Sequence, residues 1–214
     1  MHSLLSDGVL LPSELVRRAQ ALDYKAVAIT DHADASNLDQ IIKRLVNVAE
    51  SIRKHMDILF IPGVELTHIP PKTIPNLASQ ARKLGAKLVV MHGETLMEPV
   101  VQGTNRAAVD CPHIDILAHP GFITEDEAEK AKKNEIYLEL SSHGGHCLTN
   151  GHVAKIASAV NAHLLVNTDL HDPKDFISQE AAFKVAVGSG LNEQDAVKTV
   201  RNNPDEVLKR IGVK

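Results

Sequence analysis

Short apolar runs that end in an acidic residue or a histidine recur along this chain, and they constrain its fold more than any other feature. The first run, residues 26–30, is followed directly by Asp31 and His32. Its length and its β-branched residues are typical of a buried strand. The other runs and their endings are 59–64 before Glu65, 87–91 before His92, 115–118 before His119, 136–138 before Glu139 and 163–168 before Asp169. Six such endings predict that the strand ends face one common site.

Segments with helical periodicity separate these strands. Helices are predicted from Pro12, from an N-cap at Asn37, over 73–84 with Gly85 at the end, around 104–110, over 124–133, over 149–161, and as two or three helices from about Ser178. Strands that alternate with helices predict parallel β/α units, here six clear strands and a seventh at the short N-terminus. No glycine-rich phosphate loop is present, which disfavours a nucleotide-binding fold. A barrel of β/α units carries its chemistry at the carboxyl ends of the strands.

Length and composition indicate one globular domain over residues 1–214, with 43% hydrophobic residues. Aromatic residues make up only 3% of the chain and the formal net charge is −4, so we expect no long nucleic acid as a partner. No signal peptide is apparent, and no apolar run approaches the ~18 residues of a membrane span, so we expect a cytoplasmic protein. Cys111 and Cys147 form no motif and are expected to be reduced.

The residue types at the strand ends are those that bind transition metals. Zinc, manganese and iron(II) accept neutral imidazole and carboxylate ligands, so two or three such ions are the expected cofactors. A cluster of cations needs bridging carboxylates, and Glu65 is the best candidate because it follows a rigid strand. The other candidate ligands are His2, Asp7, His32, His92, His119, Asp169 and His171.

Several residues also have simpler interpretations. A single histidine or aspartate at a strand end is more often a turn residue or a helix cap, and Asp31 fits that description. Glu139 is a weaker candidate for the site than Glu65. We interpret most of the remaining histidines as surface or core residues; they are His55, His68, His113, His146, His152 and His163. The candidates for binding substrate are Arg106, Lys72 and His143, although solvation or loop flexibility explains them equally well.

Four features of the sequence resemble motifs of the PHP family, the polymerase and histidinol phosphatase domain. They are His2 with Ser6-Asp7-Gly8, Thr30-Asp31-His32, the set Gly63-Val64-Glu65, Val90-Met91-His92 and Ala118-His119-Pro120-Gly121, and Thr168-Asp169-Leu170-His171. The resemblance implies an α/β fold, a distorted seven-stranded (β/α) TIM-like barrel, with a trinuclear metal site. The chain is most similar to the free-standing phosphatase branch, which implies hydrolysis of a small phosphorylated substrate.

The resemblance also implies a role for each matched position. His2 would share one metal with Glu65 and Asp169. Glu65 would bridge to a second metal held by His92 and His119, and the third would be held by Asp7, His32 and His171. A metal-bridging hydroxide would attack phosphorus, with Glu65, Asp169 and His171 assigned to catalysis. The implied activity is that of a phosphomonoesterase of the histidinol phosphatase type.

The first motif departs from the family pattern. The family has His-x-His there, and His2 matches the second histidine, so the first would fall just before Met1. We therefore expect a truncated first strand, and we favour a start assigned too late over a trimmed chain or loss of the ligand. Two other functions stay open. One is a metal-dependent C–N hydrolase of the amidohydrolase type, and the other is a degenerate PHP module with a binding or regulatory role.

Overall fold

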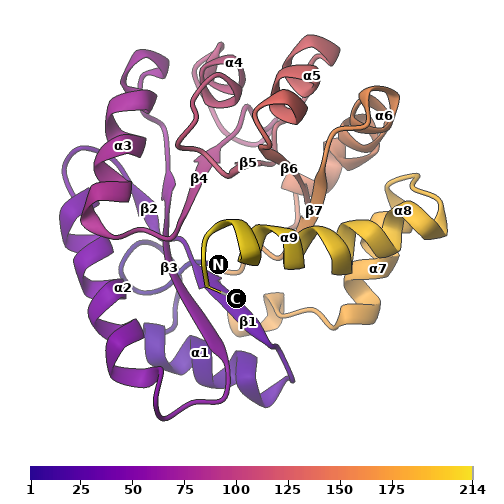
Figure 1. Ribbon diagram of the computed structural model, residues 1–214. Helices are drawn as coiled ribbons and strands as arrows, with labels where there is room; N and C mark the ends of the chain where they lie inside the picture. The colour runs from indigo at the N-terminus through magenta and orange to yellow at the C-terminus, as the bar shows by residue number, and fades with distance from the viewer. Residues whose placement is uncertain (214) are drawn as a thin grey trace.

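The strands form one parallel sheet that curves into a half-barrel (Figure 1). The computed structural model describes residues 1–213. The strands are β1 Ala26–Ile29, β2 His32–Ala33, β3 Leu59–Leu66, β4 Leu88–His92, β5 Ile116–Ala118, β6 Tyr137–Ser141 and β7 Leu164–Asn167. Their order is β1-β3-β4-β5-β6-β7, and the short β2 pairs with the end of β3. The predicted α/β fold, a distorted TIM-like barrel, is confirmed.

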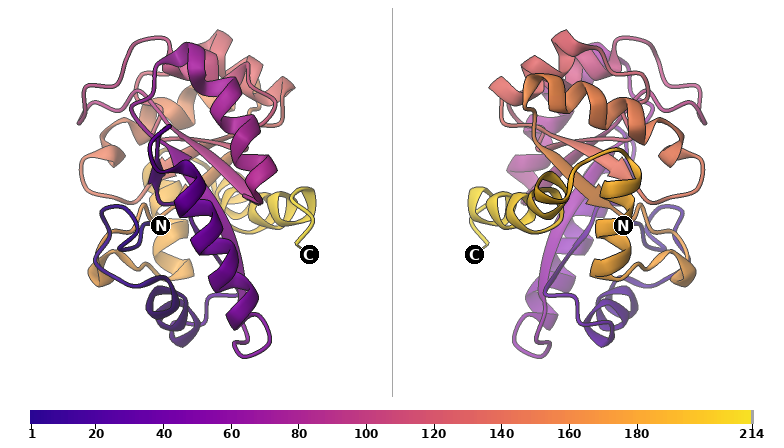
Figure 2. Two further views of the ribbon diagram at one scale, coloured as in Figure 1. Left: turned by 90° about the vertical axis from the view of Figure 1, so that its left-hand side faces the viewer. Right: turned by 90° about the vertical axis from the view of Figure 1, so that its right-hand side faces the viewer.

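Helices cover the outer face of this sheet and one end of the barrel. The helices are α1 Pro12–Ala21, α2 Leu38–Ile52, α3 Ile74–Leu84, α4 Thr104–Val109, α5 Glu125–Lys133, α6 Asn150–Val160, α7 Gln179–Gly188, α8 Glu193–Val197 and α9 Asn203–Arg210. In Figure 1, α1 to α6 lie around the outside of the strands. Figure 2 shows α9 at one end of the barrel and the loops that follow the strands at the other. No helix in the described range combines the length and the apolar character needed to cross a membrane.

Local sequence explains most of the helix ends. Thr124 begins α5 with a capping box, in which its hydroxyl accepts from the Glu127 amide and the Glu127 side chain accepts from the Thr124 amide. Gly85 ends α3 with a φ of 106°, a conformation that favours glycine. Asn37 occupies the N-cap position of α2, as expected, but its side chain makes no capping hydrogen bond. The Asn37 side chain accepts from the Asp34 amide and donates to the His32 carbonyl, so it organises the turn before α2 instead.

Each strand separates two apolar layers because its side chains alternate between the faces of the sheet. The outer layer packs the sheet against the helices, and Val64 and Leu66 of β3 belong to it. The inner layer contains Ile61 of β3, Leu88 and Val90 of β4, Ile116 and Ala118 of β5, Tyr137 of β6, Leu165 of β7 and Val207 of α9. Period-two alternation therefore also decides which residues point into the barrel where the strands end.

Residues 1–3 lie between β1 and β7 at the site end of the barrel. The Met1 carbonyl accepts from the Thr30 amide at 2.9 Å, and the His2 amide donates to the Leu170 carbonyl at 2.7 Å. β1 and β7 do not pair with each other within residues 1–213. A cavity of about 680 Å³ continues along the barrel interior, lined in part by Ala26 and Ala28 of β1 and Val207 of α9. The short N-terminal segment therefore bridges the two edge strands only where the candidate ligands lie.

Candidate metal centre

The inner faces of three strands end in candidate ligands. On β3 the inward positions run Ile61, Gly63, Glu65, and on β4 they run Leu88, Val90, His92. On β6, Glu139 follows Tyr137 by two residues and is buried. The register places His32 beside Glu65. Since all the strands are parallel, these side chains gather at one end of the barrel.

Two further ligand candidates are directed by unusual backbone conformations. His119 has a φ of 28° and Asp169 a φ of 48°, both in the left-handed region that residues with side chains rarely adopt. His119 follows the inward Ala118, so regular alternation would turn it outward. The left-handed turn instead brings its ring to Glu65 and Glu139. Strained backbone of this kind is concentrated at functional sites.

His2, Glu65 and Asp169 form the deepest group. His2 Nε2 lies 3.0 Å from Asp169 Oδ1 and 3.5 Å from Glu65 Oε2. All three side chains are at most 5% exposed. Neither ring nitrogen of His2, nor Glu65 Oε1, makes a hydrogen bond of acceptable geometry. Buried polar atoms normally have a hydrogen-bond partner. Buried nitrogen and oxygen atoms without one are therefore available to bind a metal ion.

A second group lies on the other side of Glu65. His119 Nε2 is 3.8 Å from Glu65 Oε1 and is also buried without a hydrogen bond. The rings of His92 and His119 meet edge to face, with centroids 4.4 Å apart. Glu139 Oε1 lies 3.2 Å from His119 Nδ1, an arrangement that leaves Nε2 free for an ion. Glu139, which seemed the weaker candidate, therefore orients a ligand.

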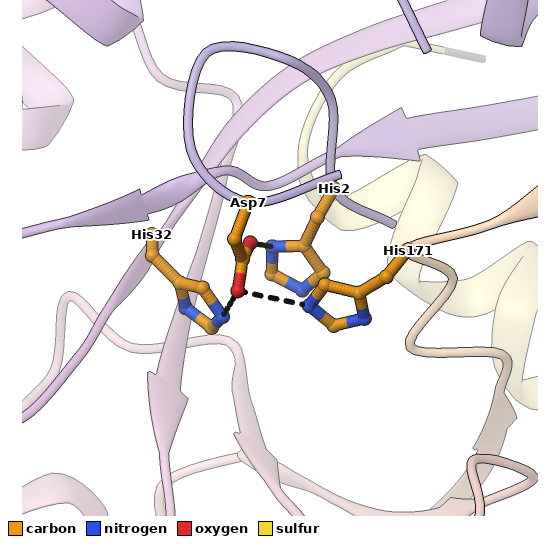
Figure 3. A group of neighbouring side chains, drawn as sticks. All are labelled: His2, Asp7, His32 and His171. Atoms are coloured by element: carbon orange, nitrogen blue, oxygen red, sulfur yellow. Dashed lines mark ion pairs between the residues drawn. The ribbon is translucent and has the colours of Figure 1, made fainter. Parts of the chain in front are cut away.

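Asp7 organises the third group, with His2, His32 and His171 around its carboxylate (Figure 3). Its Oδ2 atom lies 3.5 Å from His32 Nε2 and 3.4 Å from His171 Nε2. The His2 ring stacks on both His32 and His171, with centroids 4.1 and 4.3 Å apart. This group is more accessible than the first, because the Asp7 side chain is 54% exposed.

Asp31 holds the loop that carries His2 and Asp7. Its carboxylate is fully buried and accepts from the Ser3 amide at 2.6 Å, the Ser3 hydroxyl at 2.7 Å and the Ser6 hydroxyl at 2.8 Å. Asp31 therefore does more than cap a turn. It connects the end of β1 to the loop that supplies two candidate ligands.

The proximity of so many ionisable groups shifts their pKa values. Burial lowers the pKa of His2, but the carboxylates of Asp169 and Glu65 outweigh it and raise this pKa to about 9. At His119, burial likewise lowers the pKa, but the carboxylate of Glu139 outweighs it and raises this pKa to about 9. Burial lowers the pKa of His32 to about 4. The histidines hold the pKa values of Glu65, Asp169 and Asp7 well below the usual range despite burial. Carboxylates that stay ionised are ready ligands for cations.

Three residues that the sequence interpretation left outside the site lie within it. His146 is buried and stacks on His119, with ring centroids 4.2 Å apart. His68 Nε2 lies 2.8 Å from Glu98 Oε2, and the same oxygen lies 3.2 Å from His92 Nε2. His68 is exposed and His146 is buried, as surface and core residues are, but both lie among the candidate ligands, which the sequence interpretation did not predict. Both follow strands through loops, and the path of a loop leaves no periodic signal in the sequence.

The three candidates for binding substrate have different surroundings. The Arg106 side chain lies on α4 and pairs with Asp110 and Asp126, so its guanidinium is already engaged on the surface. Lys72 lies in the short 3-10 helix Pro71–Thr73, outside the ligand groups. His143 is close to the centre, since its ring centroid lies 5.3 Å from that of His171.

The donor set fits divalent transition metals. Five groups within residues 1–213 place at least three ligand atoms within 4.8 Å of one another, and together they include all eight predicted ligands. Imidazole nitrogens mixed with carboxylate oxygens suit zinc, manganese and iron. The unpartnered buried atoms of His2, Glu65 and His119 face the same region. The residues present therefore suit the predicted cations in chemistry and in arrangement.

Comparison with known proteins identifies similar chains. An uncharacterized protein of Methanocaldococcus jannaschii is 50% identical, over 98% of this chain and 97% of its own length. Ribonuclease P protein component 3 of Methanosarcina barkeri is 24% identical, over 95% of this chain and 85% of its own. Among solved structures, a chain of archaeal ribonuclease P with mature tRNA superimposes with a TM-score of 0.73 at 15% identity, covering 94% of this chain and 88% of that one.

These matches correct one expectation and establish the family. The expected partners, a small phosphorylated substrate and no long nucleic acid, are contradicted, because one similar protein is a ribonuclease P protein component and a chain of similar fold was solved in ribonuclease P with mature tRNA. Net charge is a weak basis for excluding RNA partners because it averages the whole surface of a protein, whereas RNA contacts use only part of a surface. The model of the PHP domain matches residues 1–182, and the chain therefore belongs to the PHP domain family.

Proposed function

We propose that this protein is a metal-dependent phosphoesterase. The observation that carries the proposal is the convergence of eight histidine, aspartate and glutamate side chains at one end of the barrel. They come from segments along the whole sheet, from one edge strand to the other. Such a cluster suits two or three divalent ions. His2, Glu65 and Asp169 would hold one of them, His92 and His119 the next, and Asp7, His32 and His171 the last.

The charge of the site explains why cations are needed for a phosphate substrate. The carboxylates of Asp7, Glu65, Glu98, Glu139 and Asp169 all lie in or beside the centre. No lysine or arginine forms an ion pair with them within the described residues. A phosphate would be repelled by this site unless metal ions offset its charge. When bound, divalent ions supply Lewis acidity toward phosphoryl oxygens and activate water for in-line attack.

The residues of the chain have definable roles in such a reaction. Glu65 lies between the first and second groups, so its two oxygens can serve both. Glu139 fixes the orientation of His119 and keeps Nδ1 engaged. His171 lies at the more accessible side beside Asp7 and His143, where a phosphoryl group can enter, and the buried Asp169 lies 3.9 Å from its Nδ1 atom. The narrower form of the proposal is a phosphomonoesterase of the histidinol phosphatase type.

A second candidate function is an RNA-associated role with protein partners, in which the PHP module binds rather than hydrolyses. The similarity to ribonuclease P protein component 3 over 95% of the chain favours it. The two candidates differ in whether the ligand cluster performs chemistry. A hydrolase acting on the phosphate end of RNA would combine them.

The test is hydrolysis of 4-nitrophenyl phosphate and of a 5′-phosphorylated RNA oligonucleotide in the presence of manganese or zinc. We expect release of phosphate that a chelator abolishes and that Glu65→Ala reduces to background. Glu129→Ala, a change of an exposed glutamate on α5, is the matched control and should retain full activity. Activity on lactams or amides alone would favour C–N hydrolysis. RNA binding without any hydrolysis would favour the RNA-associated role.

A further inference from the structure

His146 shares the hydrogen-bonding arrangement of the histidines in the predicted ligand set. In four of the predicted histidine ligands, Nδ1 faces a protein oxygen while Nε2 lies near a carboxylate in or beside the centre. The Nδ1 partners are Thr67 Oγ1 for His32 at 2.6 Å, the Gly93 carbonyl for His92 at 3.1 Å, Glu139 Oε1 for His119 at 3.2 Å and the Asp169 carbonyl for His171 at 2.9 Å. At His146 the corresponding partner is Thr95 Oγ1 at 2.7 Å.

The other nitrogen of His146 faces the centre. Its Nε2 atom lies 3.6 Å from Glu98 Oε1 and 3.8 Å from Asp169 Oδ2. These distances are too long for hydrogen bonds, so the carboxylates surround the nitrogen without satisfying it. A histidine that merely filled space in the core would have no reason to present one anchored and one open nitrogen to a cluster of ligands.

His146 is also within reach of two predicted ligands of one ion. One ring nitrogen each from His92, His119 and His146 lies within 4.8 Å of the others, and all three residues are buried. The His119 and His146 rings stack with an interplanar angle of 22°. The His146 ring centroid also lies 6.0 Å from that of His92, so the three imidazoles form one compact group.

We propose that His146 is a further metal ligand, for the ion that His92 and His119 hold, and that Thr95 is its positioning residue. This inference rests on the metal centre of the proposed function. Metal-bound histidines usually donate their other N–H to a protein oxygen, which fixes the tautomer and the ring orientation. Thr95 provides that oxygen from the loop after β4, although His146 belongs to the loop after β6.

The proposal has a consequence for the choice of metal. Three imidazoles make this position richer in nitrogen than the one formed by His2, Glu65 and Asp169. Nitrogen-rich sites favour zinc, cobalt and iron, whereas carboxylate-rich sites accept manganese and magnesium more readily. The position at His146 should therefore retain zinc or cobalt in competition with magnesium.

Competition with a chromogenic chelator tests the proposal on the metal-loaded full chain. We expect His146→Ala to lose one equivalent of zinc relative to the wild-type protein. If the smaller alanine side chain unfolds the loop, His146→Gln is used as the alternative variant. Thr95→Val should retain the ion but bind it about 10–100-fold more weakly, the usual effect of losing an orienting partner. Cobalt-loaded protein gives a second readout, because removing a nitrogen ligand changes the visible absorption of bound cobalt.

The matched control is His152→Ala. His152 lies on α6, and its Nε2 atom is 2.8 Å from the Ile123 carbonyl, outside the ligand groups. This variant should retain wild-type stoichiometry and affinity. Unchanged zinc binding and an unchanged cobalt spectrum in folded His146→Ala and His146→Gln would overturn the assignment of His146 while leaving the metal centre intact. A wild-type chain that binds no metal would overturn the metal centre itself, and with it this inference.

Discussion

At the scale of single residues, the buried polar side chains around the metal centre include both candidate ligands and the groups that position them. Glu139 and Thr95 each face the Nδ1 atom of a histidine whose Nε2 remains open. Asp31 positions a whole loop, because three donors from Ser3 and Ser6 converge on it. Loss of such a supporting group typically weakens metal binding about 10–100-fold.

Asp31→Ala should therefore weaken both the fold and the metal centre. Removing the buried carboxylate leaves the Ser3 amide and two hydroxyls without their acceptor. We expect the free energy of unfolding to fall by roughly 2–3 kcal/mol, as for a lost hydrogen bond to a charged group. We also expect weaker metal binding, because His2 and Asp7 are on the released loop. Denaturant unfolding and chelator competition measure the two effects. The exposed Asp57→Ala is the control, and equal behaviour of the two variants would refute the role of Asp31.

At the scale of elements, tight turns after the strands place the ligands. The turn after β5 runs through His119, Pro120 and Gly121, and the Asn105 side chain joins it to the loop after β4. Asn105 donates to the Pro120 carbonyl at 2.7 Å and accepts from the Glu94 amide at 3.0 Å. Gly121 has a φ of 61°, and a Cβ atom there would lie 1.9 Å from the Glu94 carbonyl oxygen.

Gly121→Ala should disrupt this turn. The left-handed conformation alone costs an alanine about 1–2 kcal/mol, and the contact with Glu94 forces the two loops apart. We expect a lower melting temperature together with loss of metal bound through His119. Gly188→Ala at the end of α7 is a suitable control, since a Cβ atom there meets nothing within 4 Å. Wild-type stability and metal content in Gly121→Ala would show that the turn does not set the ligand geometry.

At the scale of the whole molecule, periodic features of the fold were predictable from the sequence and loop-dependent features were not. Strand alternation explains why Glu65 and His92 could be predicted to face one common site. The position of His146 could not be predicted, because it depends on the path of the loop between β6 and α6. Gly145 in that loop has a φ of 93°. His68 depends on a left-handed turn in the same way. The assignment of residues 1–214 to one domain stays a prediction, as do the roles of the individual ligands.

The formal charge was the least informative global quantity. A net charge of −4 suggested that long nucleic acid was absent from the biology of this protein, yet the similar proteins are ribonuclease P components. Five of the 27 acidic residues lie in or beside the ligand cluster, where bound cations would offset their charge. A charge count that ignores cofactors therefore gives a poor guide to the partners of a metalloprotein.

The most direct test of the metal-dependent account is the metal content of the untagged protein, purified without chelator and measured by elemental mass spectrometry. We predict two to three equivalents of zinc, manganese or iron per chain, falling by at least one equivalent in Glu65→Ala, because Glu65 contacts two of the ligand groups. The same content in wild-type protein and Glu65→Ala, or no transition metal in the wild-type protein even after reconstitution, would contradict the account.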